Sequence, residues 1–156
     1  PSTLLAIAIA ASLGPGLVNL MISVGIASIP FYARIVRGAV LSVRGQEFVE
    51  AAKAMGSGDL RIIFRHILPN SMAPIIVQTT LDVAYAILSA AGLSFIGLGV
   101  QPPFPEWGSM LSGGRQYIFE APHMTLFPGI AIMLTILSLN FLGDGLRDAL
   151  DPKLRR

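Results

Sequence analysis

The sequence contains no cysteine and few charged residues. Without cysteine the chain forms no disulfide and offers no thiolate ligand to a metal. Only 13% of its residues are charged, whereas 53% are hydrophobic. Soluble globular domains have roughly 25% charged residues. The composition therefore excludes an ordinary soluble domain and predicts a membrane protein.

Enzyme signatures are also missing. Gly56-Ser57-Gly58 is not followed by the lysine that a phosphate-binding loop requires. There is no HExxH motif, and the two histidines, His66 and His123, fall on opposite predicted sides of the membrane. No nucleophile motif anchors a serine–histidine–aspartate group. The sequence therefore predicts no catalytic residue, no metal site and no cofactor bound by this chain.

Long apolar runs divide the chain into predicted membrane spans. Residues 3–13 are apolar but shorter than the ~20 residues that cross a bilayer, so they are interpreted as the end of a span. Complete spans are predicted at 16–33, where Pro30 kinks or ends the helix, at 71–98 and at 124–142. Because the chain starts at Pro1 inside an apolar run, it is interpreted as a fragment without its N-terminal part.

The distribution of basic residues predicts the orientation. They gather before and within 46–70 and in the tail 143–156: Arg34, Arg37, Arg44, Lys53, Arg61, Arg65, Arg147, Lys153, Arg155 and Arg156. Basic loops stay in the cytoplasm, so both segments are predicted to be cytoplasmic. Residues 99–123, rich in proline and glycine, are predicted to be an extracytoplasmic loop. Basic clusters also suit nucleic acids, but a chain this apolar is not expected to bind them.

Residues 46–70 predict two short helices joined by a tight turn, called here the Gln46–Asn70 hairpin. In the first helix Phe48, Ala51, Ala52 and Met55 recur with helical spacing and share one face. Gly56 is predicted to close the turn, because glycine accepts the left-handed conformation that ends helices.

The second helix of the hairpin is predicted to begin at Asp59, a good N-cap residue. Its apolar stripe consists of Leu60, Ile63, Phe64, Ile67 and Leu68, and Pro69 is predicted to end it. Arg61 and Arg65 lie on the other side, where they contact either a partner protein or anionic lipid.

The hairpin resembles the EAA loop of ABC importer permeases. The match consists of Glu50-Ala51-Ala52, Gly56 and Leu68-Pro69 at the family's spacing. The family pattern has isoleucine where this chain has His66, with Ile67 next to it. Two further blocks, GLSFIGLGVQPPFPEWGSML (92–111) and LGDGLRDALDPKLR (142–155), resemble the dipeptide, oligopeptide and nickel branch of that family.

This resemblance implies an all-α membrane protein, a polytopic transmembrane helix bundle of the type I ABC importer permease kind, multi-pass in the inner membrane. It implies an importer of di- or oligopeptides or a related small solute, in which 46–70 is the cytoplasmic coupling loop. The implied partners are a second permease subunit, two ATP-binding subunits that hold the ATP, an extracytoplasmic solute-binding protein and the lipid bilayer.

The resemblance assigns the contact with the ATP-binding subunit to six residues of the coupling loop: Glu50, Ala51, Ala52, Gly56, Leu68 and Pro69. Taken without the resemblance, Glu50 is a solvated carboxylate on an amphipathic helix, and Gly56 is a helix C-cap under either interpretation.

Asp82 is a carboxylate inside a predicted span, where it costs roughly 2.5–3.5 kcal/mol, so it should face protein or water. Gln78, Asp82, Ala86, Ala90 and Ser94 recur every four residues and stay within one half of a helix. The strip either faces the bundle or lines the pathway.

Two other functions remain open. One is an ion-coupled secondary transporter that uses Asp82, although the sequence shows no inverted repeat and no second intramembrane acid. The other is a non-transporting scaffold whose hairpin lies on the bilayer.

Overall fold

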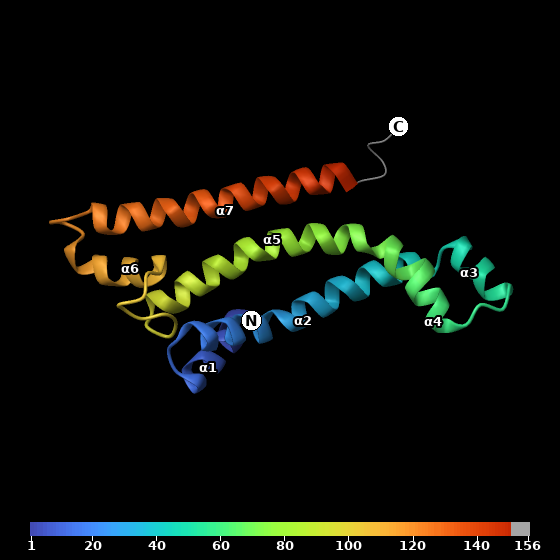
Figure 1. Ribbon diagram of the computed structural model, residues 1–156, viewed down its shortest axis with the longest axis horizontal. Coiled ribbons are helices and arrows are strands. Elements are labelled where there is room, and N and C mark those ends of the chain that lie inside the picture. Colours follow the sequence, from blue (N-terminus) through green and yellow to red (C-terminus); the bar gives the residue numbers. More distant parts are fainter. Residues whose placement is uncertain (151–156) are drawn as a thin grey trace. The chain divides into compact units, whose positions relative to one another are not determined.

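The computed structural model describes residues 1–150, and every regular element in that part of the chain is a helix. Figure 1 shows the helices coloured along the sequence. They are α1 (Ser2–Leu13), α2 (Leu17–Arg44), α3 (Glu47–Ala54), α4 (Asp59–Ile62), the π turn η1 (Ile63–Ile67), α5 (Leu68–Phe95), α6 (Trp107–Gly114), the 3-10 turn η2 (Arg115–Tyr117) and α7 (His123–Leu150). The predicted all-α class is confirmed.

Within residues 1–150, three helical stretches are long and apolar enough to cross a membrane. They are α2 with 28 residues, the continuous stretch Asp59–Phe95 with 37, and α7 with 28. At 1.5 Å per residue a helix of that length extends about 42 Å or more, which exceeds the ~30 Å of bilayer hydrocarbon. Each stretch therefore has room for an end that lies outside the hydrocarbon.

The predicted helix end at Pro69 is wrong, because the helix that begins at Asp59 continues through this proline. Of the two alternatives for Pro30, a kink or an end, the end is wrong, because α2 continues to Arg44. A proline removes one hydrogen bond, but the bonds of the neighbouring turns hold each helix together. α5 ends at Phe95, three residues before the predicted span does.

The predicted tail 143–156 begins as helix, since α7 runs to Leu150, and 151–156 lie outside the described residues. Apolar composition marks where a bilayer ends, whereas leucine, arginine and alanine continue a helix beyond it. The helix therefore continues past residue 142, where the predicted span ends.

Contacts group the chain into two units, the first of which comprises Pro1–Ile29 and Leu81–Phe141. Small side chains are frequent in its core, which lets helices approach closely. The core consists of Ala6, Ala10, Leu20, Ala27, Leu93 and Val100. The turn before α2 is fixed by hydrogen bonds: the Asn19 side-chain amide donates to the Leu13 carbonyl at 2.9 Å, and the Gly16 N–H donates to the Gly99 carbonyl at 3.0 Å.

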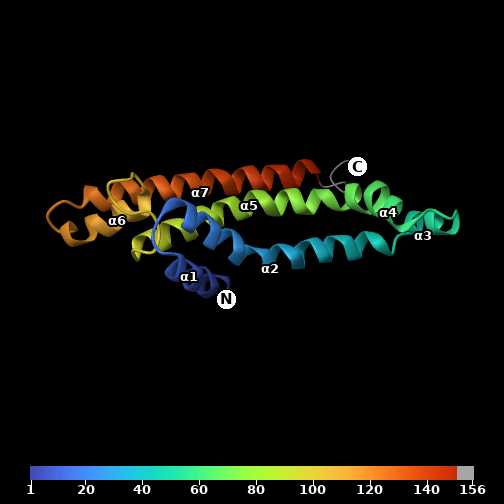
Figure 2. The ribbon, with the colours of Figure 1, turned by 60° about the horizontal axis from the view of Figure 1, so that its bottom comes forward.

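The predicted loop 99–123 contains a helix, α6, and its proline and glycine content conceals it. Glu106 begins α6, because its Oε2 accepts the N–H of Ser109 at 2.7 Å. α6 packs beside the end of α5 (Figure 2). Gly108 lies so close to α5 that a Cβ there would overlap the carbonyl oxygen of Ala91. This glycine serves close packing, not an open loop.

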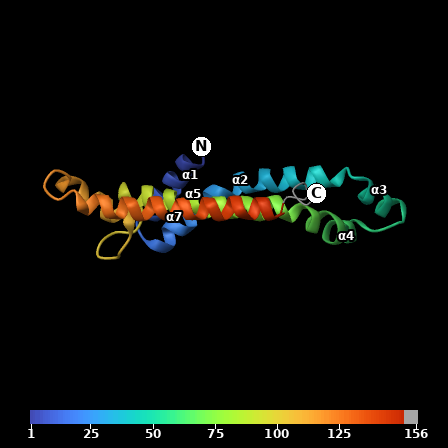
Figure 3. The same ribbon diagram turned by 90° about the horizontal axis from the view of Figure 1, so that it is seen from above.

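The second unit comprises Pro30–Thr80 and, among the described residues, 142–150. It contains the Gln46–Asn70 hairpin. Figure 3 shows α2 leading into α3, and α4 leading into α5. The hairpin is thus the connection between two long helices.

Candidate functional site

The turn of the Gln46–Asn70 hairpin is a complete C-terminal helix cap. Gly56 has φ +79°, the left-handed conformation predicted for it. Its N–H donates to the Lys53 carbonyl at 2.9 Å, and the N–H of Ser57 donates to the Ala52 carbonyl at 3.1 Å. This pair of bonds defines the Schellman motif, which satisfies carbonyls left open at a helix end. The turn is therefore set by a left-handed conformation that glycine adopts at little cost.

The second arm begins one residue earlier than predicted. Gly58 occupies the N-cap position, and Asp59 is the first residue of the helix. No side chain caps this helix start. The predicted N-cap role of Asp59 is wrong. A carboxylate in the first turn still lies at the positive end of the helix dipole, which explains why this residue suits the helix start.

A small apolar core holds the two arms together. It consists of Val43, Val49, Ala52, Ile62 and Ile67, with Val40 packed against it. Val49 and Ala52 are buried, whereas Phe48 is 39% and Met55 79% exposed. Of the four residues predicted to share one face, Ala52 alone is buried, and the helix turns Val49 toward the second arm.

The predicted apolar stripe of the second arm is also only partly buried. Ile67 is buried, but Leu60 is 72% and Phe64 66% exposed, and Ile62 is buried in their place. Beyond Ile62 the helix widens into the π turn η1, in which the N–H of Leu68 donates to the carbonyl of Ile63, five residues back. A wider turn changes which side chains share a face, and the 3.6-residue period does not anticipate it.

His66 stands where the family pattern has isoleucine. It is half-buried, and its ring centroid lies 6.5 Å from that of Phe48, with the planes tilted by 43°. Aromatic pairs at 4.5–7 Å contribute roughly 0.5–1.5 kcal/mol beyond their buried area. The departure from the pattern therefore gives the two arms an aromatic contact.

Three large apolar side chains of the hairpin are left uncovered. They are Met55, Leu60 and Phe64, each at least 66% exposed, and are called here the outer apolar row. Arg61 and Arg65 are exposed near them. Exposed apolar groups with charged neighbours are typical of a protein contact surface. The hairpin can thus offer its outer side to a partner while its inner side holds it together.

The six residues assigned to the coupling loop differ in exposure. Glu50, Ala51, Gly56 and Pro69 are exposed, Leu68 is 36% exposed and Ala52 is buried in the hairpin core. Ala52 is therefore a packing residue of the hairpin, and the exposed five are accessible to a partner.

The residues of the strip on α5 are at least partly covered. Gln78, Asp82, Ala86 and Ala90 are half-buried and Ser94 is buried, whereas Leu88 on the other half is 53% exposed. Ser94 closes the end of α5, since its Oγ accepts the N–H of Val100 at 3.1 Å. A role of Gln78 and Asp82 in the pathway stays a prediction.

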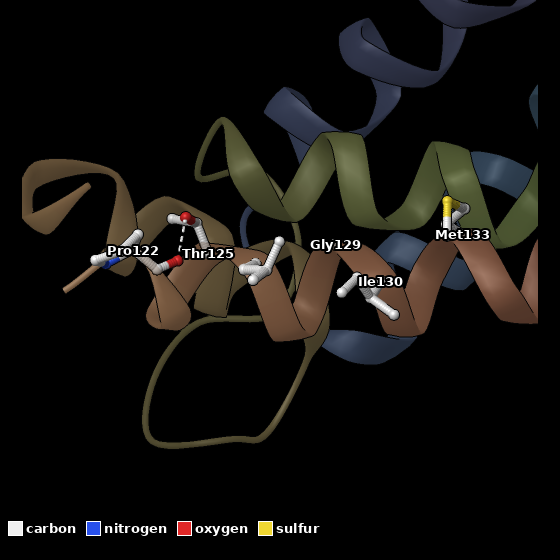
Figure 4. A pocket seen from close by; sticks show the side chains of 6 residues that line it. Pro122, Thr125, Gly129, Ile130 and Met133 are labelled. Carbon is white, nitrogen blue, oxygen red and sulfur yellow. Dashed lines mark hydrogen bonds between the residues drawn. The ribbon is translucent and has the colours of Figure 1, made fainter. Parts of the chain in front are cut away.

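A shallow groove runs along the start of α7, within the first unit (Figure 4). It is lined by Pro122, Thr125, Leu126, Gly129, Ile130 and Met133. The hydroxyl of Thr125 donates to the carbonyl of Pro122 at 3.0 Å, so even this polar group is used by the helix. The groove has no titratable side chain and does not coincide with any predicted site residue.

Comparison with known proteins gives one family and several relatives. The model of the family "Binding-protein-dependent transport system inner membrane component" matches residues 1–156. A dipeptide transport system permease protein DppC of Alkalihalophilus pseudofirmus is 59% identical over 99% of this chain and 51% of its own length. The di/tripeptide transport system permease protein DppC of Pseudomonas aeruginosa is 54% identical, again over 99% of this chain and 51% of its own length.

A third relative, the glutathione transport system permease protein GsiD of Escherichia coli, is 52% identical over 99% of this chain and 51% of its own length. The chain thus spans about half the length of the curated relatives it matches.

Proposed function

Because the chain belongs to the family of binding-protein-dependent transport system inner membrane components, we propose that it forms part of the membrane-spanning permease of an ATP-driven peptide importer. Membership confirms the resemblance to importer permeases and the inner-membrane location expected from the sequence. The proposal assigns ATP hydrolysis to separate ATP-binding subunits. It gives this chain part of the translocation pathway and the contact through which the ATPase motion arrives.

The observation that carries the proposal is the two-sided build of the Gln46–Asn70 hairpin. Its inner side is a packed core that includes Val49, Ile62 and Ile67, so the hairpin holds its own shape. Its outer apolar row is uncovered, and burial of apolar surface is the main source of stability in protein contacts. A hairpin that only connected two spans would have no need for this outer row.

The length of the two helices supports a contact away from the bilayer. α2 continues as a helix from Arg34, where its apolar run ends, to Arg44. Ten residues of α-helix extend about 15 Å. On the other side the helix begins at Asp59, before the apolar part of α5. The hairpin therefore sits at the tip of two helices, which argues against a scaffold hairpin that lies on the bilayer.

The proposed cargo is a short peptide. The names of the three relatives refer to dipeptides, di- and tripeptides, and glutathione, which are all short peptides. The proposed assembly contains a second permease subunit, two ATP-binding subunits and an extracytoplasmic solute-binding protein. Gln78 and Asp82 are proposed to face the bundle or the pathway.

Reconstitution tests the proposal. Proteoliposomes that contain the permease with this chain, its partner permease and the ATP-binding subunits are supplied with the binding protein and a labelled dipeptide. We expect uptake that requires ATP and is unaffected by collapse of the proton gradient. Uptake driven by an ion gradient without ATP would support the secondary transporter, and no uptake under either condition would support the scaffold.

The charge-reversal variant Glu50→Lys tests the docking assignment in the same vesicles. Glu50 is exposed, so its replacement should leave the spans intact and reduce the amount of ATP-binding subunit that co-purifies. Glu47→Lys, on the same helix and outside the six coupling residues, is the matched control. Equal co-purification of wild type and Glu50→Lys would remove Glu50 from the proposed contact.

A further inference from the structure

The helix between the hairpin and the membrane contains a wide turn followed by a proline. In η1 the N–H of Leu68 donates to the carbonyl of Ile63, an i→i+5 bond that adds one residue to a turn. Pro69 follows directly and donates no backbone hydrogen bond. Helices bend at π turns and at prolines. Both causes of bending therefore meet within residues 63–69.

The wide turn leaves two buried isoleucines on the same side. Ile62 and Ile67 both belong to the hairpin core, although they are five residues apart. In a regular α-helix five residues rotate about 500°, which leaves the two side chains about 140° apart. A π turn has more residues per turn, so it brings Ile67 back to the side of Ile62.

A helix with one residue fewer between Ile62 and Ile67 would also place both side chains on the same side. If Arg65 were absent, Ile62 and Ile67 would be four residues apart, which is about 40° from alignment in an α-helix. Leu60 and Phe64 precede Arg65, so the outer apolar row would keep its spacing as well. Arg65 itself is exposed. The additional residue thus serves neither the core nor the outer row.

What the additional residue changes is the surrounding of Pro69. A proline ring clashes with the carbonyl four residues back, here that of Arg65, and a clash of this kind forces a kink. A wider turn moves that carbonyl away from the ring. Nearby, the side-chain amide of Asn70 donates to the carbonyl of His66 at 2.7 Å. This side-chain bond gives the His66 carbonyl a hydrogen-bond partner next to the proline.

We propose that the η1 π turn and Pro69 together form a bending joint through which the hairpin moves α5. This inference rests on the proposed function, because it concerns how the ATPase motion passes from the hairpin into the span. The wide turn relieves the clash that would fix one kink angle, and the proline removes a bond that would hold the helix straight. The joint therefore lets the angle change while the hairpin core and the outer apolar row stay intact.

The test is a double variant that restores a regular helix: deletion of Arg65 combined with Pro69→Ala. Arg65→Ala is the reference variant, because it loses the same exposed side chain and keeps the residue count, so any effect of that side chain on docking is common to both variants. Both are reconstituted with the ATP-binding subunits and the binding protein. Relative to Arg65→Ala, we expect the double variant to retain the ATP-binding subunits and their ATP hydrolysis, since alanine keeps an apolar side chain at position 69, but to lose about tenfold or more in peptide uptake per ATP hydrolysed.

A second measurement does not depend on transport. The chain has no cysteine, so cysteines at Ser57 and Thr79 can carry a pair of spin labels on the hairpin and on α5. In the wild type we expect the distance distribution to shift or broaden when ATP binds to the assembled transporter. In the double variant it should be narrow and independent of ATP.

The two measurements separate the joint from the proposed function. Unchanged uptake per ATP in the double variant, an unchanged width of its distance distribution, or loss of its ATP-binding subunits would each overturn the joint, since the proposal requires an intact docking side. If the wild type showed no ATP-driven uptake, the proposed function would be overturned. If the spin-label distance distribution were still narrower in the double variant than in the wild type, the joint would nevertheless be supported.

Discussion

Replacement of Gly56 by valine should loosen the hairpin turn without creating a steric clash. Gly56 has φ +79°, and a Cβ built there meets no atom within 4 Å. The cost is therefore confined to the backbone conformation. For an L-residue the left-handed conformation costs roughly 1–2 kcal/mol, and a β-branched residue is among the least suited to it. Asparagine tolerates this conformation well and is the matched control.

The magnitude follows from the two bonds that close the turn. The N–H groups of Gly56 and Ser57 donate to Lys53 and Ala52, so both bonds break when the turn opens. A change of 1–2 kcal/mol raises the population of open turns about 5–30-fold. In Gly56→Val the backbone amide of Ser57 should exchange with deuterium faster by this factor, whereas Gly56→Asn should stay near the wild type.

The assay is hydrogen exchange on the assembled permease, read from a peptide that covers residues 52–60, alongside ATP-driven uptake. Uptake should fall in Gly56→Val, because the outer apolar row is held in place by the turn, and protein yield should not. Equal exchange rates in the valine and asparagine variants would refute the conformational argument. Equal uptake in the two variants, with the exchange rates separated as expected, would mean that the turn does not set the docking side.

Three further predictions concern topology, packing and Asp82. With single cysteines at Ser57 and Phe119, a membrane-impermeant reagent applied to intact cells should label only Phe119→Cys, and the opposite pattern would reverse the predicted orientation. Gly108→Ala should lower the thermal stability of the purified permease by roughly 1–3 kcal/mol, because its Cβ would overlap Ala91, whereas Gly113→Ala, which meets no atom within 4 Å, should not. Asp82→Asn should keep most ATP-driven uptake between about pH 5.5 and 8, since asparagine preserves the shape and most hydrogen bonds of the side chain; loss of accumulation with ATP hydrolysis intact would instead indicate an ion-coupled step.

The helical class was predictable because it depends on features that tertiary packing does not reverse. Long apolar runs must become helices in a bilayer, because the α-helix is the only conformation in which a single segment forms all its backbone hydrogen bonds within itself. The turn at Gly56 was predictable for a similar reason, because glycine adopts positive φ more readily than any other residue type. The helix ends were not predictable from hydropathy. It reports the edge of the hydrocarbon, and α2 continues as a helix well past it to Arg44.

The α6 helix shows a second limit. Proline and glycine near residues 99–123 suggest an open loop, yet Trp107–Gly114 is helical. Glu106 provides the start of the helix by accepting the N–H of Ser109, which is a local signal that the sequence contains. Gly108 lies inside this helix and does not end it; its missing side chain allows the close approach to Ala91. The same residue type can thus end a helix or bring two helices together, and only the neighbouring element decides which.

The buried faces of the hairpin show where periodicity itself fails. Counting by 3.6 residues groups Leu60 and Phe64 with Ile67 in one stripe, yet the first two are exposed while Ile62 and Ile67 are buried. The stripe divides because apolar residues are present on both sides of this helix: one set forms the core, and the other is left for a partner. A helical period identifies the buried face only where one face alone is apolar. In this helix, packing against Val49 and Ala52 of the first arm decides which set becomes the core, and no local propensity specifies that choice.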